Sequence, residues 1–237
     1  PATLTIANSS FTSNYGIKLT NATATIKGNT FSGTKYGVYV YNSNVSVSIK
    51  NNDITNSTDY GIYLEDAENV VITDNTLTNS YIFITGTTIE AFNSHTIANN
   101  NTIDGSPVYY IVDQDAPSIP TDGGEYIIAN CTNVAIEDRG FTGMLMAFEI
   151  AYSNVTVNNV SFVSNGIGLY LVSLYDGSTV NAYFESNKYG IHVKNSKLVV
   201  AGTFKNNLYG IYAEGANLTI DSMHMYNDYL EFQSSDV

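Results

Sequence analysis

Carboxylates are the side chains of this 237-residue chain best suited to acid–base chemistry. Glu65, Asp66, Glu149 and Glu214 are candidates on one face of the molecule. Hydrolysis of a glycosidic bond needs a general acid and a second carboxylate that converge on that bond. No spacing in the sequence singles out such a pair, so we interpret these groups as solvated surface charges.

Two short motifs hold all four methionines, Met144-Leu145-Met146 and Met223-His224-Met225. In an extended strand each motif places two thioethers on the same side. Thioether and imidazole groups suit copper, above all Cu(I), but methionine is also a common core filler. We favour core packing and keep a metal site as an alternative, with the candidates Met144, Met146, Met223, His224 and Met225.

Other reactive groups are few. The three histidines, His95, His192 and His224, lie far apart without ligand spacing. The single cysteine, Cys131, excludes an intrachain disulfide and is interpreted as a small buried hydrophobic residue. The sequence shows no nucleotide-binding loop and no Ser-His-Asp ordering, so it predicts no catalytic residue.

Charge is scarce and one-sided. Charged residues make up 13% of the chain, with 9 basic against 22 acidic and a net charge of −13. This balance argues against nucleic acid and anionic membranes as partners, because both recruit Lys and Arg. A hydrophobic share of 43%, with 19 Tyr and 10 Phe, excludes a disordered acidic tail. Neutral polar residues replace the charge, including 29 Asn.

The compartment is predicted to be extracellular. The chain starts at Pro1 without a signal peptide or an apolar stretch of membrane-spanning length, so we expect a mature product or a fragment with no direct membrane insertion. Nine N-x-S/T sequons, with few basic residues and one cysteine, favour an exported and glycosylated chain. The candidate acceptors are Asn8, Asn21, Asn44, Asn56, Asn100, Asn130, Asn154, Asn159 and Asn217.

An internal repeat gives the fold class. The unit Tyr-Gly-Ile/Val recurs at Tyr15, Tyr36, Tyr60, Tyr189 and Tyr209, with degenerate copies between them, mostly 19 to 24 residues apart. Strict alternation of apolar and polar residues follows each Gly, as in Ile62-Tyr63-Leu64. This period and alternation predict a parallel β-solenoid of roughly ten coils stacked about 4.8 Å apart.

Asparagine marks the coil corners. Each coil ends with an Asn before an apolar residue, as in Asn29-Thr30-Phe31 and Asn52-Asp53-Ile54. Asn tolerates the left-handed backbone conformation, and stacked Asn side chains can hydrogen-bond from coil to coil. We therefore predict one all-β domain over residues 1–237, with an irregular excursion at 105–124 where three of the four prolines occur.

Alternation also predicts which side chains point outward. Tyrosine is frequent at these positions, namely at Tyr39, Tyr41, Tyr63, Tyr170 and Tyr212. Tyrosine combines apolar area with a hydrogen-bonding end, which suits sugar rings or another subunit. High strand propensity explains the same enrichment without a ligand. The tyrosines that precede each Gly are expected to form a structural stack at the corner.

The chain resembles the right-handed parallel β-helix repeat family and, within it, the NosD-like branch of periplasmic copper-binding proteins. Tyr-Gly-Ile-Tyr-Leu units and Asn-x-Ile/Leu/Phe corners carry the resemblance over almost the whole chain. The segment Asn101-Thr102-Ile103-Asp104-Gly105-Ser106-Pro107-Val108-Tyr109-Tyr110 and the later Asn130-Cys131-Thr132-Asn133-Val134 are especially similar. The resemblance implies a right-handed single-stranded parallel β-helix, and archaeal surface proteins are similar in composition.

The Asn-Thr-Asp, Asp-Asp, Gly-His-Gly and Arg-Ile-Lys units of polygalacturonase-like members are missing from the sequence. Pectate-lyase-like chemistry needs calcium carboxylates and a basic residue, but the single arginine, Arg139, has only Glu137 and Asp138 beside it. We therefore expect a non-enzymatic envelope protein of a prokaryote, of archaeal type, that serves as a surface-layer, sheath or adhesive module. Its expected partners are copies of itself or other envelope proteins.

Two alternatives stay open. One is a carbohydrate-binding or polysaccharide-degrading β-helix protein, with polysaccharide as its partner. The other is a copper-binding accessory protein of the NosD type. The residues themselves predict no cofactor, and copper or calcium enters only with these alternatives.

Overall fold

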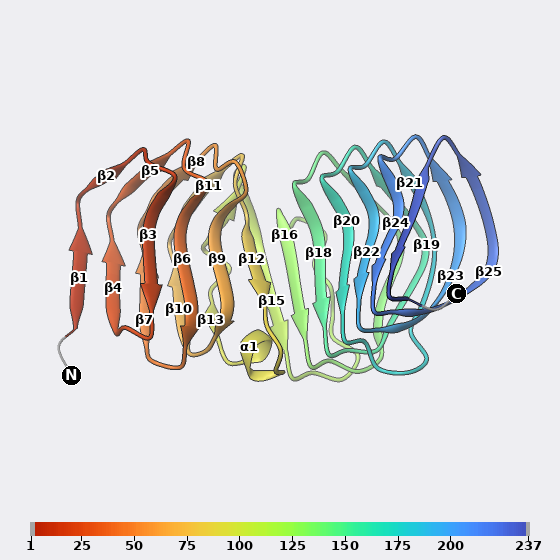
Figure 1. Ribbon diagram of the computed structural model, residues 1–237, viewed down its shortest axis with the longest axis horizontal. Helices are drawn as coiled ribbons and strands as arrows, with labels where there is room; N and C mark the ends of the chain where they lie inside the picture. The colour runs from red at the N-terminus through yellow and green to blue at the C-terminus, as the bar shows by residue number, and fades with distance from the viewer. Residues whose placement is uncertain (1–2, 236–237) are drawn as a thin grey trace. The chain divides into compact units, whose positions relative to one another are not determined.

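A computed structural model describes residues 3–235 of the chain. The fold is all-β, with 62% of residues in strands and 2% in helix, and it forms a parallel β-solenoid of about 11 turns. The predicted fold class is confirmed. Figure 1 shows the strands of successive turns lying side by side.

The chain divides into two compact units. Unit 1 comprises Pro1–Tyr110 and Asp122–Glu125, and unit 2 comprises Ile111–Thr121 and Tyr126–Val237. The chain passes between them within the segment 105–124 and just after it. The single domain predicted for residues 1–237 stays a prediction.

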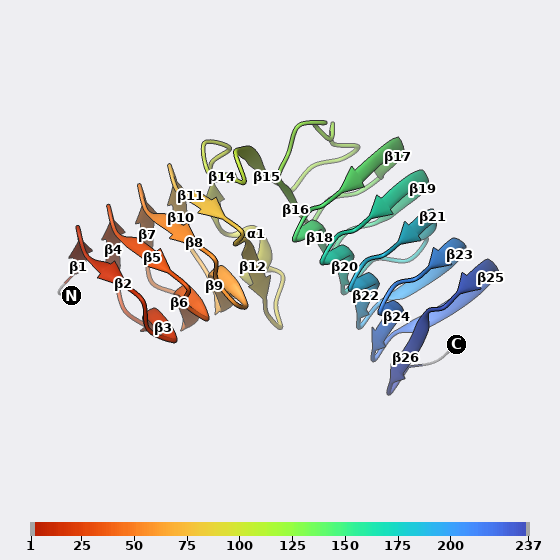
Figure 2. The same ribbon diagram turned by 90° about the horizontal axis from the view of Figure 1, so that it is seen from above.

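Unit 1 builds most turns from three short strands (Figure 2). The first strands of its turns are β1 (Leu4–Ala7), β4 (Ala24–Lys27), β7 (Val47–Lys50), β10 (Val70–Thr73) and β13 (Thr96–Ile97). The second are β2 (Ser10–Phe11), β5 (Thr30–Ser32), β8 (Asp53–Thr55), β11 (Thr76–Thr78) and β14 (Thr102–Ile103). The third are β3 (Tyr15–Thr20), β6 (Tyr36–Ser43), β9 (Tyr60–Ala67) and β12 (Ile82–Thr85).

The excursion interrupts this pattern. A short helix, α1 (Glu90–Asn93), follows β12, and β15 (Ser106–Val112) starts antiparallel to β14, with Ile103 opposite Ser106. The amide of Gly124 donates to the carbonyl of Pro107 at 2.7 Å, which closes the part of the excursion that belongs to unit 1.

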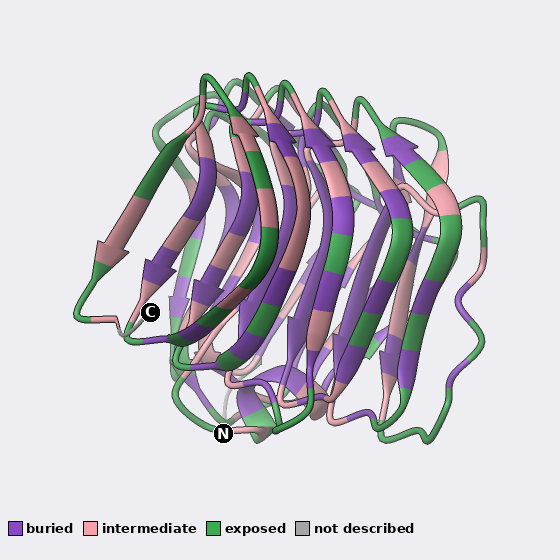
Figure 3. Cartoon of the chain, turned by 90° about the vertical axis from the view of Figure 1, so that its right-hand side faces the viewer, coloured by how far each residue is buried: buried purple, intermediate pink, exposed green. Residues whose placement is uncertain are grey.

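Unit 2 uses longer strands, mostly two per turn. One set forms a five-stranded sheet of β17 (Val134–Thr142), β19 (Val155–Val163), β21 (Thr179–Glu185), β23 (Lys197–Lys205) and β25 (Asn217–Tyr226). The other set comprises β16 (Glu125–Ala129), β18 (Met146–Ala151), β20 (Ile167–Val172), β22 (Tyr189–Lys194), β24 (Tyr209–Glu214) and β26 (Tyr229–Gln233). Figure 3 shows buried and exposed residues alternating along these strands.

The core is a stack of equivalent side chains. In unit 2 the rings of Phe162, Phe184 and Phe204 stack with centroids 5.0 and 4.8 Å apart. All three side chains are fully buried. In unit 1 the equivalent column is mostly aliphatic, because Phe31 lies in register with Ile54 and Ile54 with Leu77. Cys131 is also buried, as predicted.

Hydrogen-bonded asparagine ladders connect the turns, as predicted. In unit 1 the Nδ2 of Asn29 donates to Oδ1 of Asn52 at 3.0 Å, and Asn52 donates in the same way to Asn75 at 2.9 Å. Asn75 repeats the contact with Asn101 at 2.9 Å. All four side chains are buried, so these bonds satisfy amides that would otherwise be costly to bury.

One detail of the corner prediction is wrong. The ladder residues Asn29 and Asn52 do not adopt the left-handed conformation, whereas Gly28 and Asn51, which precede them, do so at φ +62° and +51°. At each of these corners the first residue, Gly28 or Asn51, turns the backbone. The residue that follows it hydrogen-bonds to the next turn. Of the 24 non-glycine residues with positive φ in the described part, 13 are Asn and 5 are Asp, which explains much of the asparagine content.

Candidate functional site

The outward face of the Tyr-Gly-Ile strands is the candidate site, and each unit carries its own version. In unit 1, β3, β6, β9 and β12 align their outward residues in columns, with Lys18 beside Tyr39 and Tyr39 beside Tyr63. In unit 2, β20, β22, β24 and β26 align Tyr170, His192, Tyr212 and Glu231 in the same way.

Aromatic rings fill the face of unit 1. Tyr39 and Tyr63 stack with centroids 4.8 Å apart, and Phe83 continues the column 5.9 Å from Tyr63. Tyr41 lies at the side of Tyr39, with centroids 6.0 Å apart. Three of the predicted binding tyrosines are therefore brought together, and the ring of Tyr39 contacts those of the other two.

The tyrosines at the corner join this cluster. Tyr36 lies 5.3 Å from Tyr15 and 5.7 Å from Tyr60, measured between ring centroids, and it also contacts Tyr39 at 5.4 Å. In unit 2 the rings of Tyr189 and Tyr209 stack at 5.1 Å. The predicted corner stack is present in both units.

Polar contacts fix the rings of unit 1. The hydroxyl of Tyr39 donates to Oε2 of Glu65, and burial together with this carboxylate raises the pKa of Tyr39. The hydroxyl of Tyr63 is 3.0 Å from Oγ1 of Thr85, and burial raises the pKa of Tyr63 to about 12. The ammonium of Lys18 lies 4.6 Å from the centroid of Tyr39. Both phenols are therefore neutral hydrogen-bonding groups at neutral pH.

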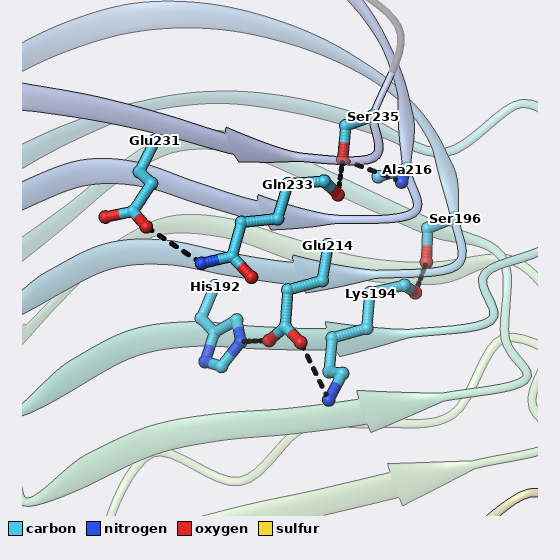
Figure 4. Close-up of polar contacts among 8 residues, drawn as sticks. All are labelled: His192, Lys194, Ser196, Glu214, Ala216, Glu231, Gln233 and Ser235. Carbon is cyan, nitrogen blue, oxygen red and sulfur yellow. Dashed lines mark hydrogen bonds and ion pairs between the residues drawn. The ribbon is translucent and has the colours of Figure 1, made fainter.

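The face of unit 2 carries a charged cluster (Figure 4). Nε2 of His192 lies 2.7 Å from Oε1 of Glu214, and Nζ of Lys194 lies 3.2 Å from Oε2 of the same carboxylate. Gln233 donates from Nε2 to Oε1 of Glu231 at 2.8 Å. Figure 4 shows these side chains lying over β22, β24 and β26.

Electrostatics link the three groups. Burial lowers the pKa of His192 and outweighs the opposite effect of Glu214. Partial burial acts to raise the pKa of Glu214, but the hydrogen bond from His192 and the charge of Lys194 outweigh it, and the net shift is downward. At neutral pH the cluster therefore holds a neutral imidazole between aromatic rings, with an ionised Glu214 paired to Lys194.

Two glutamates differ from the sequence-based interpretation or were missed by it. Glu149, interpreted as a solvated surface charge, is fully buried. Glu125 is fully buried as well, and its Oε2 accepts a hydrogen bond from the amide of Ile82 at 3.2 Å. The alternation of β18 places Glu149 outward, but only the tertiary structure shows that this position is covered. Tyr170, which lies in register with Glu149, is 2% exposed.

The methionine motifs lie on different strands of unit 2. Met146 is buried in register with Ile167, and Met225 lies in register with Phe204, so both occupy the inner column. His224 lies in register with Thr203, one position away from Met225, and side chains alternate along a strand. The side chain of His224 therefore points away from the thioethers beside it.

His95 is buried and structural. Its Nδ1 accepts from the amide of Val70 at 3.3 Å, and its Nε2 lies 2.9 Å from the carbonyl of Ala91. Burial lowers its pKa to about 4. Within residues 3–235, no group of three or more His, Cys, Asp or Glu side chains is arranged to hold a metal ion.

The candidate glycosylation sites are spread over the corners. Seven of them are exposed, namely Asn8, Asn21, Asn44, Asn56, Asn100, Asn159 and Asn217. Asn130 and Asn154 are half-buried, and the Nδ2 of Asn130 donates to Asp113 at 2.7 Å. In the described part of the chain, no helix is long and apolar enough to cross a membrane.

Comparison with known proteins adds one finding. Residues 2–116 match the family model described as periplasmic copper-binding protein (NosD). No protein with a curated description matches the chain. The matched region holds the first asparagine ladder and the tyrosine-rich face of unit 1, and unit 2 continues the same solenoid repeat. The chain is therefore a NosD-like parallel β-helix repeat protein.

Proposed function

We propose that the chain is a non-enzymatic structural or adhesive module of a prokaryotic cell envelope, located outside the cytoplasm. The observation that carries this proposal is that side chains on the outward face of neighbouring turns contact each other through ring stacking, hydrogen bonds and ion pairs. Tyr39 is stacked on Tyr63 and bonded to Glu65, while His192 and Lys194 share Glu214. Such a face is already ordered, which suits a rigid scaffold.

The location is supported by two observations. The matched family is described as periplasmic. The acidic composition, with 13% charged residues and a single buried cysteine, is that of an exported chain rather than of a nucleic-acid or membrane-surface binder. We propose that it belongs to a surface layer, a sheath or an adhesive structure of an archaeal-type envelope.

Cell fractionation tests the location. In the organism that produces the chain, an antibody should detect it in the envelope or exterior fraction, and protease added to intact cells should remove the signal. A cytoplasmic protein of known location is the matched control. Recovery of the chain with that control in the cytoplasmic fraction would overturn the proposal.

An activity assay tests the absence of catalysis. The purified chain, incubated with a panel of neutral and acidic polysaccharides, should release no reducing ends. Activity that is lost in the Glu149→Gln variant would show that the buried carboxylate is catalytic, and the structural proposal would then be wrong. The Glu68→Gln variant, which changes a half-buried carboxylate of unit 1, is the control for nonspecific effects.

Copper binding is the second candidate and is supported by the description of the matched family. The methionine candidates all lie outside the matched residues 2–116, where the one histidine is the buried His95. Titration of the chain with Cu(I) against a chromophoric chelator distinguishes the two proposals. Competition that is abolished in the Met223→Leu/Met225→Leu double variant would establish a copper site on β25.

A further inference from the structure

A shallow groove crosses the turns of unit 2 on the outer surface of β19, β21 and β23. It encloses about 240 Å³. The side chains and backbone that matter for its chemistry belong to Asn158, Asn159, Asn181, Tyr183, Gly202 and Thr203. The groove lies on a different sheet from the tyrosine-rich face described above, because these strands belong to the five-stranded sheet of unit 2.

Backbone irregularities create the groove. Asn159 adopts φ +53° in the middle of β19, and the register with β21 shifts between Asn158 and Val160. Such bulges bend a strand and re-aim its side chains. On β23, Gly202 has φ +118°, and a Cβ there would collide with the carbonyl oxygen of Ala182. No side chain can therefore fill the floor of the groove at this point.

Uncharged amides line the groove. Asn181 donates from Nδ2 to Oδ1 of Asn158 at 3.3 Å. The Nδ2 donors of Asn158 and the Oδ1 of Asn181 have no hydrogen-bond partner among the described residues. The hydroxyl of Thr203 lies in the same groove and makes no side-chain hydrogen bond within the described part. An amide offers both a donor and an acceptor, which matches the paired hydroxyls of a sugar.

Tyr183 forms a fixed aromatic wall. Its hydroxyl donates to Oε2 of Glu185 at 2.7 Å, and Nζ of Lys205 lies 2.7 Å from Oε1 of the same carboxylate. This hydrogen bond raises the pKa of Tyr183 and keeps the phenol neutral. Unlike Tyr39 and Tyr63, Tyr183 is not stacked on another ring in the described part of the chain, so its face is available to a ligand.

We infer that this groove binds a segment of neutral polysaccharide that lies across the turns. Hydroxyl groups of the ligand would bond to Asn158, Asn181 and Thr203, and a sugar ring would pack on Tyr183. Carboxylates at the margin, including Asp138, which accepts from Asn159 at 2.7 Å, disfavour an anionic polymer. The inference goes beyond the proposed envelope role and does not depend on it.

Affinity electrophoresis tests the inference with named probes. The purified full chain is run through native gels that contain mixed-linkage β-glucan, galactomannan or dextran, with polygalacturonate as the anionic comparison. We expect at least one neutral polymer to retard the chain and polygalacturonate to leave it unretarded. Failure of all three neutral polymers, or stronger retardation by polygalacturonate, would overturn the inference.

Variants then locate the binding. The Asn158→Ala/Asn181→Ala double variant should raise the dissociation constant at least about tenfold, because it removes two hydrogen-bonding side chains. Thr203→Arg, which fills the groove with a long side chain, should have the same effect. The matched control, Thr156→Ala/Thr219→Ala, changes exposed threonines on β19 and β25 outside the groove and should bind normally.

Melting curves and gel retardation together distinguish lost binding from lost folding. The circular dichroism melting curves of the variants should match that of the parent chain, because the substituted residues are at the surface. Parent-like retardation of both groove variants would overturn the inference. If no polysaccharide binds, the inference fails but the envelope role still depends only on the fractionation test. If the chain is found in the cytoplasm, the envelope role fails but the polysaccharide-binding result still stands.

Discussion

The two units place their asparagine ladders at different corners of the turn. In unit 1 the ladder that includes Asn29 and Asn52 separates the first strand of each turn from the second. In unit 2 the ladder lies one corner later, between the long strand and the Tyr-Gly-Ile strand. There Asn165 donates to Asn187 at 3.0 Å, Asn187 to Asn207 at 2.8 Å and Asn207 to Asp228 at 2.6 Å.

This difference shows what a ladder does to the backbone. Where the ladder is present in unit 1, the chain breaks into β4 and β5 at Gly28 and Asn29. At the corresponding point of unit 2, Asn159 is left-handed but is followed by Val160, and β19 continues through the bend as one strand. The bend without a ladder is the place where the groove forms.

The residue before the ladder also differs. Unit 1 uses Gly28, Asn51 and Asp74 in the left-handed conformation, whereas two corners of unit 2 use Ser164 and Ser186 at φ +56° and +57°. Serine lacks the tolerance of glycine or asparagine for this conformation. We infer that these two corners of unit 2 carry more backbone strain, which the ladder bonds and the phenylalanine column offset.

The largest expected effect comes from breaking a ladder in its middle. Asn52→Ala leaves the amide of Asn29, which donates to Oδ1 of Asn52 at 3.0 Å, and the carbonyl of Ile26 without their partners. We expect a loss of about 4 kcal/mol in the free energy of unfolding, since each buried polar group left unpaired costs about 1–3 kcal/mol. Asn187→Ala should cost a similar amount in unit 2.

Hydrogen exchange followed by mass spectrometry, combined with urea unfolding, assigns each loss to a unit. The control is Asn44→Ala, which changes an exposed asparagine and should leave stability within about 0.5 kcal/mol of the parent chain. If Asn187→Ala proved as mild as this control, the two ladders would not be equivalent and the comparison would fail.

Acid should weaken unit 1 through His95. The native pKa is about 4 against an ordinary 6.5, so the unfolded chain binds the proton first as the pH falls. The contribution is fully present above pH 6.5 and is lost by about pH 4, with a total of about 3 kcal/mol. Urea unfolding at pH 7 and pH 4.5 measures it.

Carboxylates also make the free energy of unfolding depend on pH. Comparing two histidine variants with the parent chain isolates the part that comes from His95. His95→Gln should flatten the pH dependence of unit 1, while His224→Gln, which changes an exposed histidine, should keep it. The lowered pKa of His192 gives unit 2 a dependence of the same sign. Equal slopes for parent and His95→Gln would show that His95 is not the source.

The smallest effect tests the strain at the corners of unit 2. Ser186→Gly should stabilise unit 2 by about 0.5–1 kcal/mol, because glycine adopts the left-handed conformation without a steric cost. The reverse change in unit 1, Gly28→Ser, should cost about 1 kcal/mol. Thermal unfolding of the two variants measures both, and a destabilising Ser186→Gly would refute the strain argument.

Particular residues show how far sequence reasoning reaches. The alternation after each Gly correctly places Ile62 and Leu64 inside and Tyr63 outside. The corner asparagines of unit 1 are recognisable as a ladder, because each of the four lies two residues before an apolar residue, at Asn29, Asn52, Asn75 and Asn101. The ladder of unit 2 is harder to recognise, since Asn165 and Asn187 each stand two residues before the start of a strand, β20 or β22, and resemble ordinary turn residues.

The candidate sites are less accessible to this reasoning. Glu149 looks like a surface charge in the sequence and Glu125 does not stand out there, and only the structure shows that both are fully buried. The groove at Asn158 and Gly202 depends on a register shift, which no periodicity reveals. In the His192–Glu214–Lys194 cluster, Glu214 lies 22 positions after His192 and 20 after Lys194, and only the register of the turns brings it to them.

The sequence by itself determined the repeat, the strand alternation and the parallel solenoid, because these follow from the short-range order of apolar residues, glycine and asparagine. It also determined the low content of charged residues. In the ladders, neutral asparagine amides satisfy each other's hydrogen bonds and need no charged partner. Only the tertiary structure decided which corner each ladder occupies, which carboxylates are buried and where the surface is hollow. Those features depend on packing between successive turns, whose register is set by that packing rather than by the order of residues within one turn.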